Sequence, residues 1–233
     1  MADGSEPHSG PIDSEAELGD FSYIVSHDLA AVFRQMQAFS ALLVRDLGDA
    51  ASPKQHEYIT HMEAAAVRGQ AMIDELRAFS RLQRRPLTVQ PCDCAMLVKA
   101  ASLQLAAQIR RTDARISVAD LGVVCTDHVL FVEALRRILD NAIKFAGPDA
   151  RPQIDIRRGR AADGWTLRIT DAGTGVAAGQ EEKVFQMFHR LDRDRDGVGA
   201  GLTVARRMMR RLGGDVRICP QAIGACVEMR LPQ

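Results

Sequence analysis

Two runs of apolar residues that repeat at steps of three and four constrain the fold of this chain more than any other feature. They span about residues 15–47 and 53–84 of the 233-residue sequence. This spacing gathers the apolar side chains on one face of an α-helix. Between the runs, Ser52 suits an N-cap, with Pro53 in the first helical position and Gln55 completing a capping box. The sequence therefore predicts an antiparallel hairpin of two long helices.

A lone hairpin of this kind leaves half of each apolar stripe exposed to water. Each helix of about 30 residues would be roughly 45 Å long, so the exposed area would be large. Pairing two hairpins into a four-helix bundle would bury both stripes. We therefore expect a homodimer. The alternative is that the hairpin packs against the C-terminal part of its own chain.

From residue 86 onward the pattern changes to alternating helices and strands. Strand-like alternation occurs at residues 115–121, 153–158, 165–170, 215–219 and 225–231, and helical spacing at 93–109, 126–145, 180–187 and 200–212. We therefore expect a mixed sheet with helices on one face, an α/β sandwich. Residues 1–14 contain few large apolar residues and are expected to be a flexible tail. The expected domains are the hairpin at 15–85 and the α/β sandwich at 86–233.

Composition and charge narrow the classes of function. Thirty basic and thirty acidic residues give no net charge, so nothing indicates nucleic acid or an anionic membrane as a partner. No apolar run approaches the roughly 20 residues of a membrane-spanning helix, and the N-terminus lacks the apolar core of a signal peptide. We expect a cytoplasmic protein whose five cysteines are reduced thiols. The cluster Arg206, Arg207, Arg210 and Arg211 is expected to form a solvated helix face.

A histidine with a carboxylate beside it lies in the first helical run, in the sequence Ser-His-Asp-Leu at residues 26–29. An imidazole that accepts a phosphoryl group needs one accessible, unprotonated nitrogen and a partner that orients the other nitrogen. Asp28 is suited to accept the ring N–H of His27 and to raise the nucleophilicity of the far nitrogen. Taken alone, such a pair is more often an ordinary surface histidine than a phosphoacceptor.

Two glycine-rich segments follow in the C-terminal half. They are Asp-Ala-Gly-Thr-Gly at 171–175 and Gly-Val-Gly-Ala-Gly-Leu at 197–202, and the helical stretch Asp-Asn-Ala-Ile-Lys-Phe at 140–145 precedes both. Glycine lets a backbone approach a nucleotide closely, although glycines also occur in ordinary tight turns. The order of the histidine, the 140–145 stretch and the two glycine segments is the strongest functional signal in the chain.

With these motifs in this order, residues 20–231 resemble the catalytic core of sensor histidine kinases. That core joins a dimerisation and phosphotransfer hairpin to an ATP-binding domain of the Bergerat fold, which gyrase, Hsp90 and MutL share. Residues 185–191, Phe-Gln-Met-Phe-His-Arg-Leu, are similar to the F-box of phytochrome-like kinases. Residues 26–29 are similar to their H-box.

The resemblance implies a role for each motif, with ATP and Mg²⁺ as cofactors. His27, beside Asp28, would be the phosphoacceptor, and Asn141 would hold Mg²⁺. Lys144 would lie near the phosphates, and the Asp171 carboxylate would accept a hydrogen bond from the exocyclic amine of adenine. The remaining matched positions would line the base or the triphosphate: Gly173 and Gly175 for the base, and Gly197, Gly199, Gly201 and Leu202 for the phosphates.

Four positions and one loop depart from the family pattern. Val32 stands where a helix-kinking proline is usual, and Ala31 stands where Thr or Asn orients a hydrolytic water, which predicts weak phosphatase activity. Arg137 replaces a polar or acidic residue, so that its guanidinium would either pair with phosphate or disturb magnesium binding. Ala172 replaces the usual asparagine. Residues 192–196 would form a short ATP lid or a solvated run of charges.

The sequence is therefore interpreted as a two-component protein-histidine kinase. It would autophosphorylate His27 from Mg-ATP and pass the phosphoryl group to an aspartate of a response-regulator receiver domain. Sensory input would come from a separate protein or from a longer chain. One alternative is a catalytically degenerate histidine phosphotransferase or pseudokinase that acts as a relay. A second alternative is a Bergerat-fold serine kinase acting on an anti-sigma partner, which would not need the His27 hairpin.

Overall fold

The computed structural model describes the backbone of residues 11–147, 151–159, 164–190 and 197–232. The chain divides between Arg85 and Pro86 into two compact units. The first is the helical hairpin, and the second contains both of the sheets that the described residues form.

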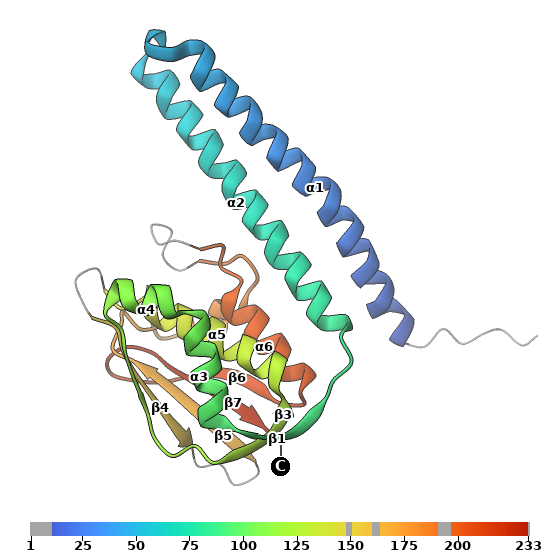
Figure 1. Ribbon diagram of the computed structural model, residues 1–233, viewed down its shortest axis with the longest axis vertical. Helices are drawn as coiled ribbons and strands as arrows, with labels where there is room; N and C mark the ends of the chain where they lie inside the picture. The colour runs from blue at the N-terminus through green and yellow to red at the C-terminus, as the bar shows by residue number, and fades with distance from the viewer. Residues whose placement is uncertain (1–10, 148–150, 160–163, 191–196, 233) are drawn as a thin grey trace, which may run out of the picture. The chain divides into compact units, whose positions relative to one another are not determined.

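The hairpin consists of α1 (Pro11–Leu47), a 3₁₀ turn (Gly48–Ala50) and α2 (Pro53–Arg84), and its two helices run side by side in opposite directions (Figure 1). The predicted capping box is confirmed: Gln55 N donates to Ser52 Oγ over 3.3 Å, and Ser52 N donates to Gln55 Oε1 over 2.7 Å. Helix α1 begins earlier than expected, so residues 11–14 are helical instead of part of a tail. Residues 1–10 of that expected tail lie outside the described residues.

Small residues allow the two helices of the hairpin to approach each other. Ala30 on α1 and Ala66 on α2 are fully buried. Further along α2, Gly69 faces the ring of Phe33, and a methyl group at Gly69 would collide with that ring. The contact between the helices is therefore narrow, and it leaves much of their apolar surface uncovered.

The second unit is built on a mixed five-stranded sheet. Its strands lie in the order β2 (Arg115–Val118), β4 (Gln153–Gly159), β5 (Trp165–Asp171), β7 (Cys226–Leu231) and β6 (Asp215–Cys219). Strands β2 and β4 are parallel, and every other neighbouring pair is antiparallel. The predicted mixed sheet and α/β sandwich are therefore confirmed.

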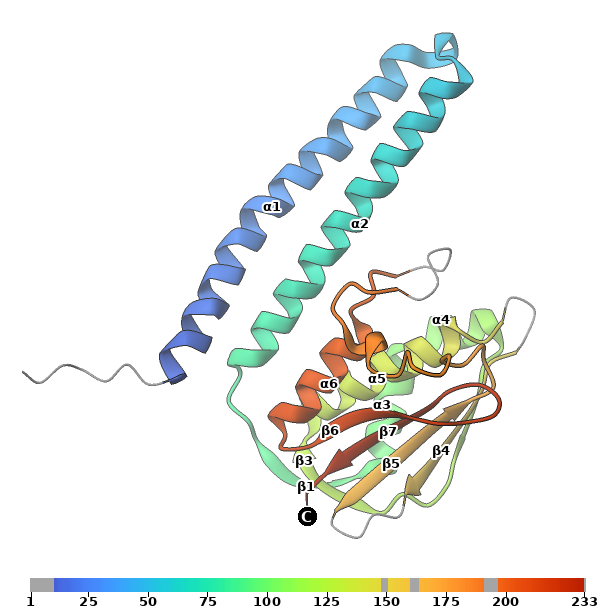
Figure 2. The ribbon, with the colours of Figure 1, turned by 180° about the vertical axis from the view of Figure 1, so that it is seen from behind.

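Helices cover one face of this sheet (Figures 1 and 2). They are α3 (Cys94–Gln104), α5 (His128–Lys144) and α6 (Gly201–Arg211), with the short α4 (Ala106–Thr112) following α3. The core lies between α5 and the sheet, where the ring of Phe131 meets the edge of Trp165 at 5.7 Å between centroids. The opposite face, which we call the open face, carries no helix formed by the described residues.

Three local predictions were wrong. The helix expected at 180–187 is only a 3₁₀ turn (Lys183–Phe185), and the helix expected at 93–109 breaks at Leu105. A two-stranded ribbon, β1 (Val89–Asp93) with β3 (Val123–Asp127), was not predicted, because its strands are short and Pro91 interrupts the strand pattern.

Among the described residues, none of the helices combines the length and the apolar character needed to cross a membrane.

Helix α5 is capped by Asp127, so the helix begins at His128, two residues later than the helical stretch expected at 126–145. The Asp127 side chain is fully buried. Its Oδ1 accepts hydrogen bonds from Val129 N at 3.0 Å and Leu130 N at 3.2 Å, and its Oδ2 accepts one from Thr88 N at 2.8 Å. This one carboxylate therefore joins the start of α5 to the segment that enters the second unit.

We predict that Asp127→Ala lowers the free energy of unfolding of the second unit by about 2–4 kcal/mol, because it removes a cap and leaves buried N–H groups unpaired. Urea unfolding followed by the fluorescence of Trp165, the only tryptophan in the sequence, measures this. The matched control is Asp93→Ala, which removes the exposed cap of α3 and should cost about 1 kcal/mol. Equal losses in the two variants would contradict the prediction.

Candidate functional site

Asp171 ends β5 and is the most unusual carboxylate of the second unit. It is only 8% exposed. Its Oδ1 accepts hydrogen bonds from Gly173 N at 2.9 Å and from Ala225 N at 3.1 Å. Its Oδ2 accepts no hydrogen bond from any residue that the structure describes. Burial raises the pKa of Asp171 above its usual value, and the two backbone hydrogen bonds only partly offset this effect.

The loop that follows Asp171 lies against the end of α5. Thr174 N donates to the carbonyl oxygen of Phe145 over 3.0 Å, and Phe145 is the residue that ends α5. Gly175 has a φ of +74°, and a side chain there would approach the carbonyl oxygen of Gly224 to 2.7 Å. Glycine is therefore required at 175 both by conformation and by space.

Asn141 and Lys144 lie in the last turn of α5, beside this loop. Asn141 is half-buried, Lys144 is exposed, and the Lys144 Nζ lies 2.6 Å from Asp140 Oδ2. The structure therefore brings the expected magnesium and phosphate residues to the same end of the unit as the Asp171 loop. An amide oxygen is a suitable ligand for Mg²⁺, and an ammonium group suits a phosphate. The residues present fit these two ligands.

The second glycine segment leads into α6, next to α5. A side chain at Gly201, the first residue of α6, would lie 4.0 Å from the carbonyl oxygen of Arg137, one turn before Asn141. Leu202 is buried in the core. The first N–H groups of a helix of this length suit an anionic ligand. The start of α6 thus faces the helix that carries Asn141.

The phrase similar to an F-box is joined to the same glycine segment. Phe188 N donates to the carbonyl oxygen of Gly199 over 2.9 Å. Gly199 has a φ of +73°, and a side chain there would meet the carbonyl oxygen of His189 at 2.6 Å. Gly197 is exposed. The lid expected at 192–196 lies outside the described residues.

Arg206 was not predicted as a site residue, and the prediction that it lies on a solvated helix face was wrong. Its side chain is only 13% exposed and bonds Asp215 at 2.9 Å and Glu182 at 2.6 Å. The guanidinium also lies 4.4 Å from the ring centre of Phe185. Arg206 therefore fastens the F-box-like phrase to α6, assisted by Thr203 Oγ1, which donates to Phe185 O over 2.8 Å. In the sequence, only the cluster of arginines pointed to this residue. The spacing of the charges does not distinguish an arginine that bonds a neighbouring loop from one on a solvated helix face.

Arg137, the departure expected either to pair with phosphate or to disturb magnesium binding, is buried in α5. Its Nε lies 2.8 Å from Glu133 Oε1, and Arg136 pairs with the same carboxylate. Burial raises the pKa of Glu133, but the two arginines outweigh it and the pKa is lowered overall. The charge of Arg137 is therefore matched within its own helix.

His27 and Asp28 belong to the hairpin unit, whereas the other candidate residues belong to the second unit. Both lie within α1, which continues without a break through Ala31 and Val32. Asp28 is exposed, and the His27 side chain is not among the described ones. The uninterrupted helix fits the absence of proline at position 32.

Comparison with known proteins identifies the second unit. Residues 126–233 match the sequence model of a family described as histidine kinase-, DNA gyrase B- and HSP90-like ATPases. The methanogenesis regulatory histidine kinase FilI of Methanothrix harundinacea is 29% identical over 219 residues, which are 93% of this chain and 25% of that protein. The phytochrome-like protein Cph1 of Synechocystis is 27% identical over 205 residues, which are 87% of this chain and 27% of that protein. The chain thus spans about a quarter of the length of these relatives.

Solved structures show the same fold over both units. Full-length ShkA in complex with AMPPNP matches with a TM-score of 0.62 at 19% identity, covering 92% of this chain and 46% of that chain. Histidine kinase ThkA in complex with the response regulator TrrA matches with a TM-score of 0.63 at 16% identity, covering 94% and 63%. By its fold, by its family match over residues 126–233 and by its kinase relatives, the chain is similar to the catalytic core of sensor histidine kinases, and phytochrome-like kinases are among those relatives.

Proposed function

We propose that this chain transfers the γ-phosphoryl group of ATP to His27 and then to an aspartate of a response-regulator receiver domain. The observation that carries the proposal is the placement of Asp171, whose Oδ2 is left without a described hydrogen-bond donor beside the glycine loop and the end of α5. Dependence on ATP makes a cytoplasmic location part of the same proposal.

Asp171 would select the base. Its Oδ2 would accept a hydrogen bond from the exocyclic amine of adenine, a group that guanine lacks at the corresponding position, so ATP would bind in preference to GTP. Lys144 and the first N–H groups of α6 would hold the phosphates. Mg²⁺, held by Asn141, would supply neutralisation of the phosphate charge when bound.

The transfer itself would be a displacement at the γ-phosphorus. A ring nitrogen of His27 forms the new N–P bond while the bond to the bridging oxygen breaks and ADP leaves. Asp28 would accept the proton on the other ring nitrogen and favour attack. The resulting phosphoramidate would pass its phosphoryl group to a carboxylate. The response regulator crystallised with the structural relative ThkA supports that class of partner.

A second copy of the chain is part of the proposal. Five apolar residues of α1 are exposed at steps of three and four and form one stripe: Leu29, Val32, Met36, Phe39 and Leu43. A stripe with this spacing is what a helix presents to a partner helix in a bundle. A homodimer that forms a four-helix bundle would cover it.

The relay remains the alternative, and one observation favours it. The two basic side chains of α5 that the sequence analysis linked to the phosphates are already paired within the helix, Lys144 with Asp140 at 2.6 Å and Arg137 with Glu133 at 2.8 Å. A relay would bind ATP weakly or not at all. The affinity of the reduced, folded chain for ATP therefore distinguishes the two functions.

We predict that the purified chain, incubated with γ-labelled ATP and Mg²⁺, takes up acid-labile, base-stable label. His27→Gln should abolish this label, because no other residue has the same context. The matched control is His56→Gln, which changes an exposed histidine on α2 and should leave labelling intact. Label that persists in His27→Gln would exclude His27 as the acceptor, and its absence from the unchanged chain would favour the relay.

We predict that Asp171→Asn weakens ATP binding at least tenfold, a cost of about 1.4 kcal/mol, without destabilising the fold. The asparagine oxygen can still accept from Gly173 N and Ala225 N, but its amide nitrogen cannot accept from adenine. Titration calorimetry measures the affinity, and urea unfolding measures the stability.

The two measurements also test the pH dependence. Because the pKa of Asp171 is raised in the folded state, its protonated form favours folding, and this contribution is lost as pH rises through that pKa. Asp171→Asn should therefore be at least as stable as the unchanged chain at neutral pH. ATP binding by the unchanged chain should weaken on acidification at a pH above the ordinary aspartate pKa. Unchanged affinity in the variant would exclude Asp171 from base recognition.

We predict that Phe39→Glu dissociates the homodimer, because Phe39 is the most exposed residue of the α1 stripe, at 59%, and the interface would bury the new charges. Light scattering coupled to size-exclusion chromatography measures the mass, and circular dichroism checks that the helices persist. Ala41→Glu places the same charge on the opposite side of α1 and should remain dimeric. A monomeric unchanged chain, or equal behaviour of the two variants, would refute this interface.

A further inference from the structure

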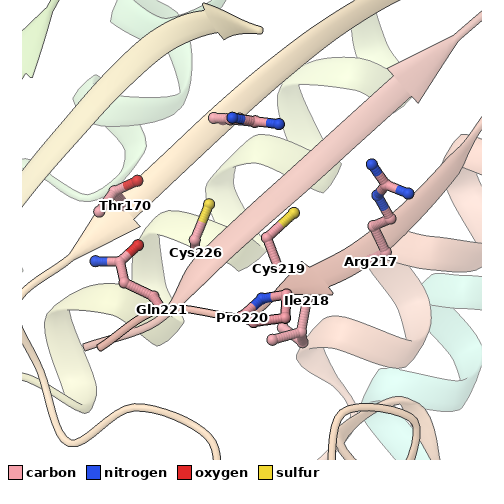
Figure 3. A pocket seen from close by; sticks show the side chains of 8 residues that line it. Thr170, Arg217, Ile218, Cys219, Pro220, Gln221 and Cys226 are labelled. Atoms are coloured by element: carbon pink, nitrogen blue, oxygen red, sulfur yellow. The ribbon is translucent and has the colours of Figure 1, made fainter. Parts of the chain in front are cut away.

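Two cysteines face each other on the open face of the sheet. Cys219 ends β6, Cys226 begins β7, and the two residues are direct partners in the antiparallel register. Figure 3 shows their sulfur atoms side by side at a hollow of about 520 Å³, which Thr170, Arg217 and Gln221 also line. Both cysteines are reduced.

This geometry is close to that of a disulfide. Directly opposed residues of an antiparallel pair have Cβ atoms about 4.5–5.5 Å apart, and a disulfide needs about 3.5–4.5 Å. Closing the bond therefore requires only a small movement of the two strand ends. The other ribbon offers a contrast, because Cys92 is opposite Val124 and Cys125 is opposite Pro91, so those two thiols point to opposite faces.

The strand ends that would move are bonded directly to Asp171. Ala225, the residue before Cys226, donates its N–H to Asp171 Oδ1 over 3.1 Å. Its carbonyl oxygen accepts from Asp171 N over 2.9 Å. A shift of Cys226 towards Cys219 therefore acts on both hydrogen bonds that tie the β6–β7 connection to the candidate base-recognition carboxylate.

We propose that Cys219 and Cys226 are a reversible dithiol–disulfide site for hydroperoxides, and that closing the disulfide displaces Ala225 from Asp171 and weakens nucleotide binding. The effect on nucleotide rests on the proposed function, whereas the disulfide does not. One thiolate attacks a peroxide oxygen, the O–O bond breaks, and a sulfenic acid forms. The second thiol displaces the sulfenic oxygen as water, so that two thiols and hydrogen peroxide become one disulfide and two water molecules.

The surroundings of the pair set the pH at which it reacts. Burial raises the pKa of Cys219, and Cys226 and Glu228 on β7 raise it further, whereas Arg217 on β6 lowers it. Arg168 on β5 pairs with Glu228 at 2.8 Å. Because the thiolate is the reactive form, oxidation should be faster at about pH 8.5 than at about pH 7. The site would therefore respond slowly at neutral pH.

Intact mass measurement of the full chain tests the disulfide. Treated with hydrogen peroxide, the unchanged chain and the control variant Cys92→Ser should each lose two hydrogen atoms and regain them with a reductant. Cys219→Ser and Cys226→Ser should not lose them. Absence of the loss in the unchanged chain, or its persistence in either of these two variants, would overturn the proposal.

Hydrogen–deuterium exchange tests the connection to Asp171 without nucleotide. Oxidation should speed exchange of the Ala225 and Asp171 amides, and it should weaken binding of a fluorescent ATP analogue roughly tenfold, as expected for one lost hydrogen bond to a charged group. A disulfide that leaves exchange unchanged would overturn the connection. If the reduced chain does not bind the analogue, the proposed function is wrong. The intact-mass and hydrogen–deuterium exchange measurements would still test whether the disulfide forms and whether it acts on Asp171.

Discussion

The carboxylate of Asp171 joins three parts of the second unit that are far apart in sequence. One of its oxygens accepts from Gly173 N in the loop after β5 and from Ala225 N in the connection before β7. The loop in turn rests on the end of α5, where Thr174 N donates to Phe145 O. Removing this single acceptor would leave two backbone donors unpaired in a partly buried place, which is costly. The shape of the candidate nucleotide site therefore depends on this residue.

Helix α5 provides the rigid support on which these contacts act. Its N-terminal cap, Asp127, is fully buried, and the helix supplies large core side chains such as Phe131 and Leu135. Only its last turn, with Asn141 and Lys144, lies beside the glycine loop. A site whose polar residues stand at the end of a tightly packed helix is held more exactly in place than one built on loops. Helix α5 therefore packs into the core with its apolar face and presents polar side chains to the ligand only in its last turn.

Long-range periodicity and capping chemistry were readable from the sequence, whereas tertiary contacts were not. Ser52 and Gln55 mark the start of α2 because the cap is a local interaction, and strand alternation predicted β6 at its observed bounds. The segment 180–187 forms only a short 3₁₀ turn, and Arg206, more than twenty residues away in sequence, bonds Glu182 and lies against the ring of Phe185 there. The pairing of Ala225 with Asp171 is equally invisible to local patterns. Motif order predicted which residues gather at the site, but not the contacts that position them.

Two buried carboxylates in neighbouring strands differ in their hydrogen-bond partners. One has partners on both oxygens, and the other has an oxygen left for a ligand. Glu228 on β7 is 1% exposed, and each of its oxygens accepts from an arginine, Arg168 at 2.8 Å and Arg217 at 2.9 Å. These cations outweigh burial, and the pKa of Glu228 is lowered. Among the described residues, Asp171 has only neutral N–H donors, all on one oxygen, and its pKa is raised. A buried carboxylate whose oxygen accepts no hydrogen bond lowers the stability of the fold. A ligand that donates a hydrogen bond to that oxygen would restore the lost free energy on binding.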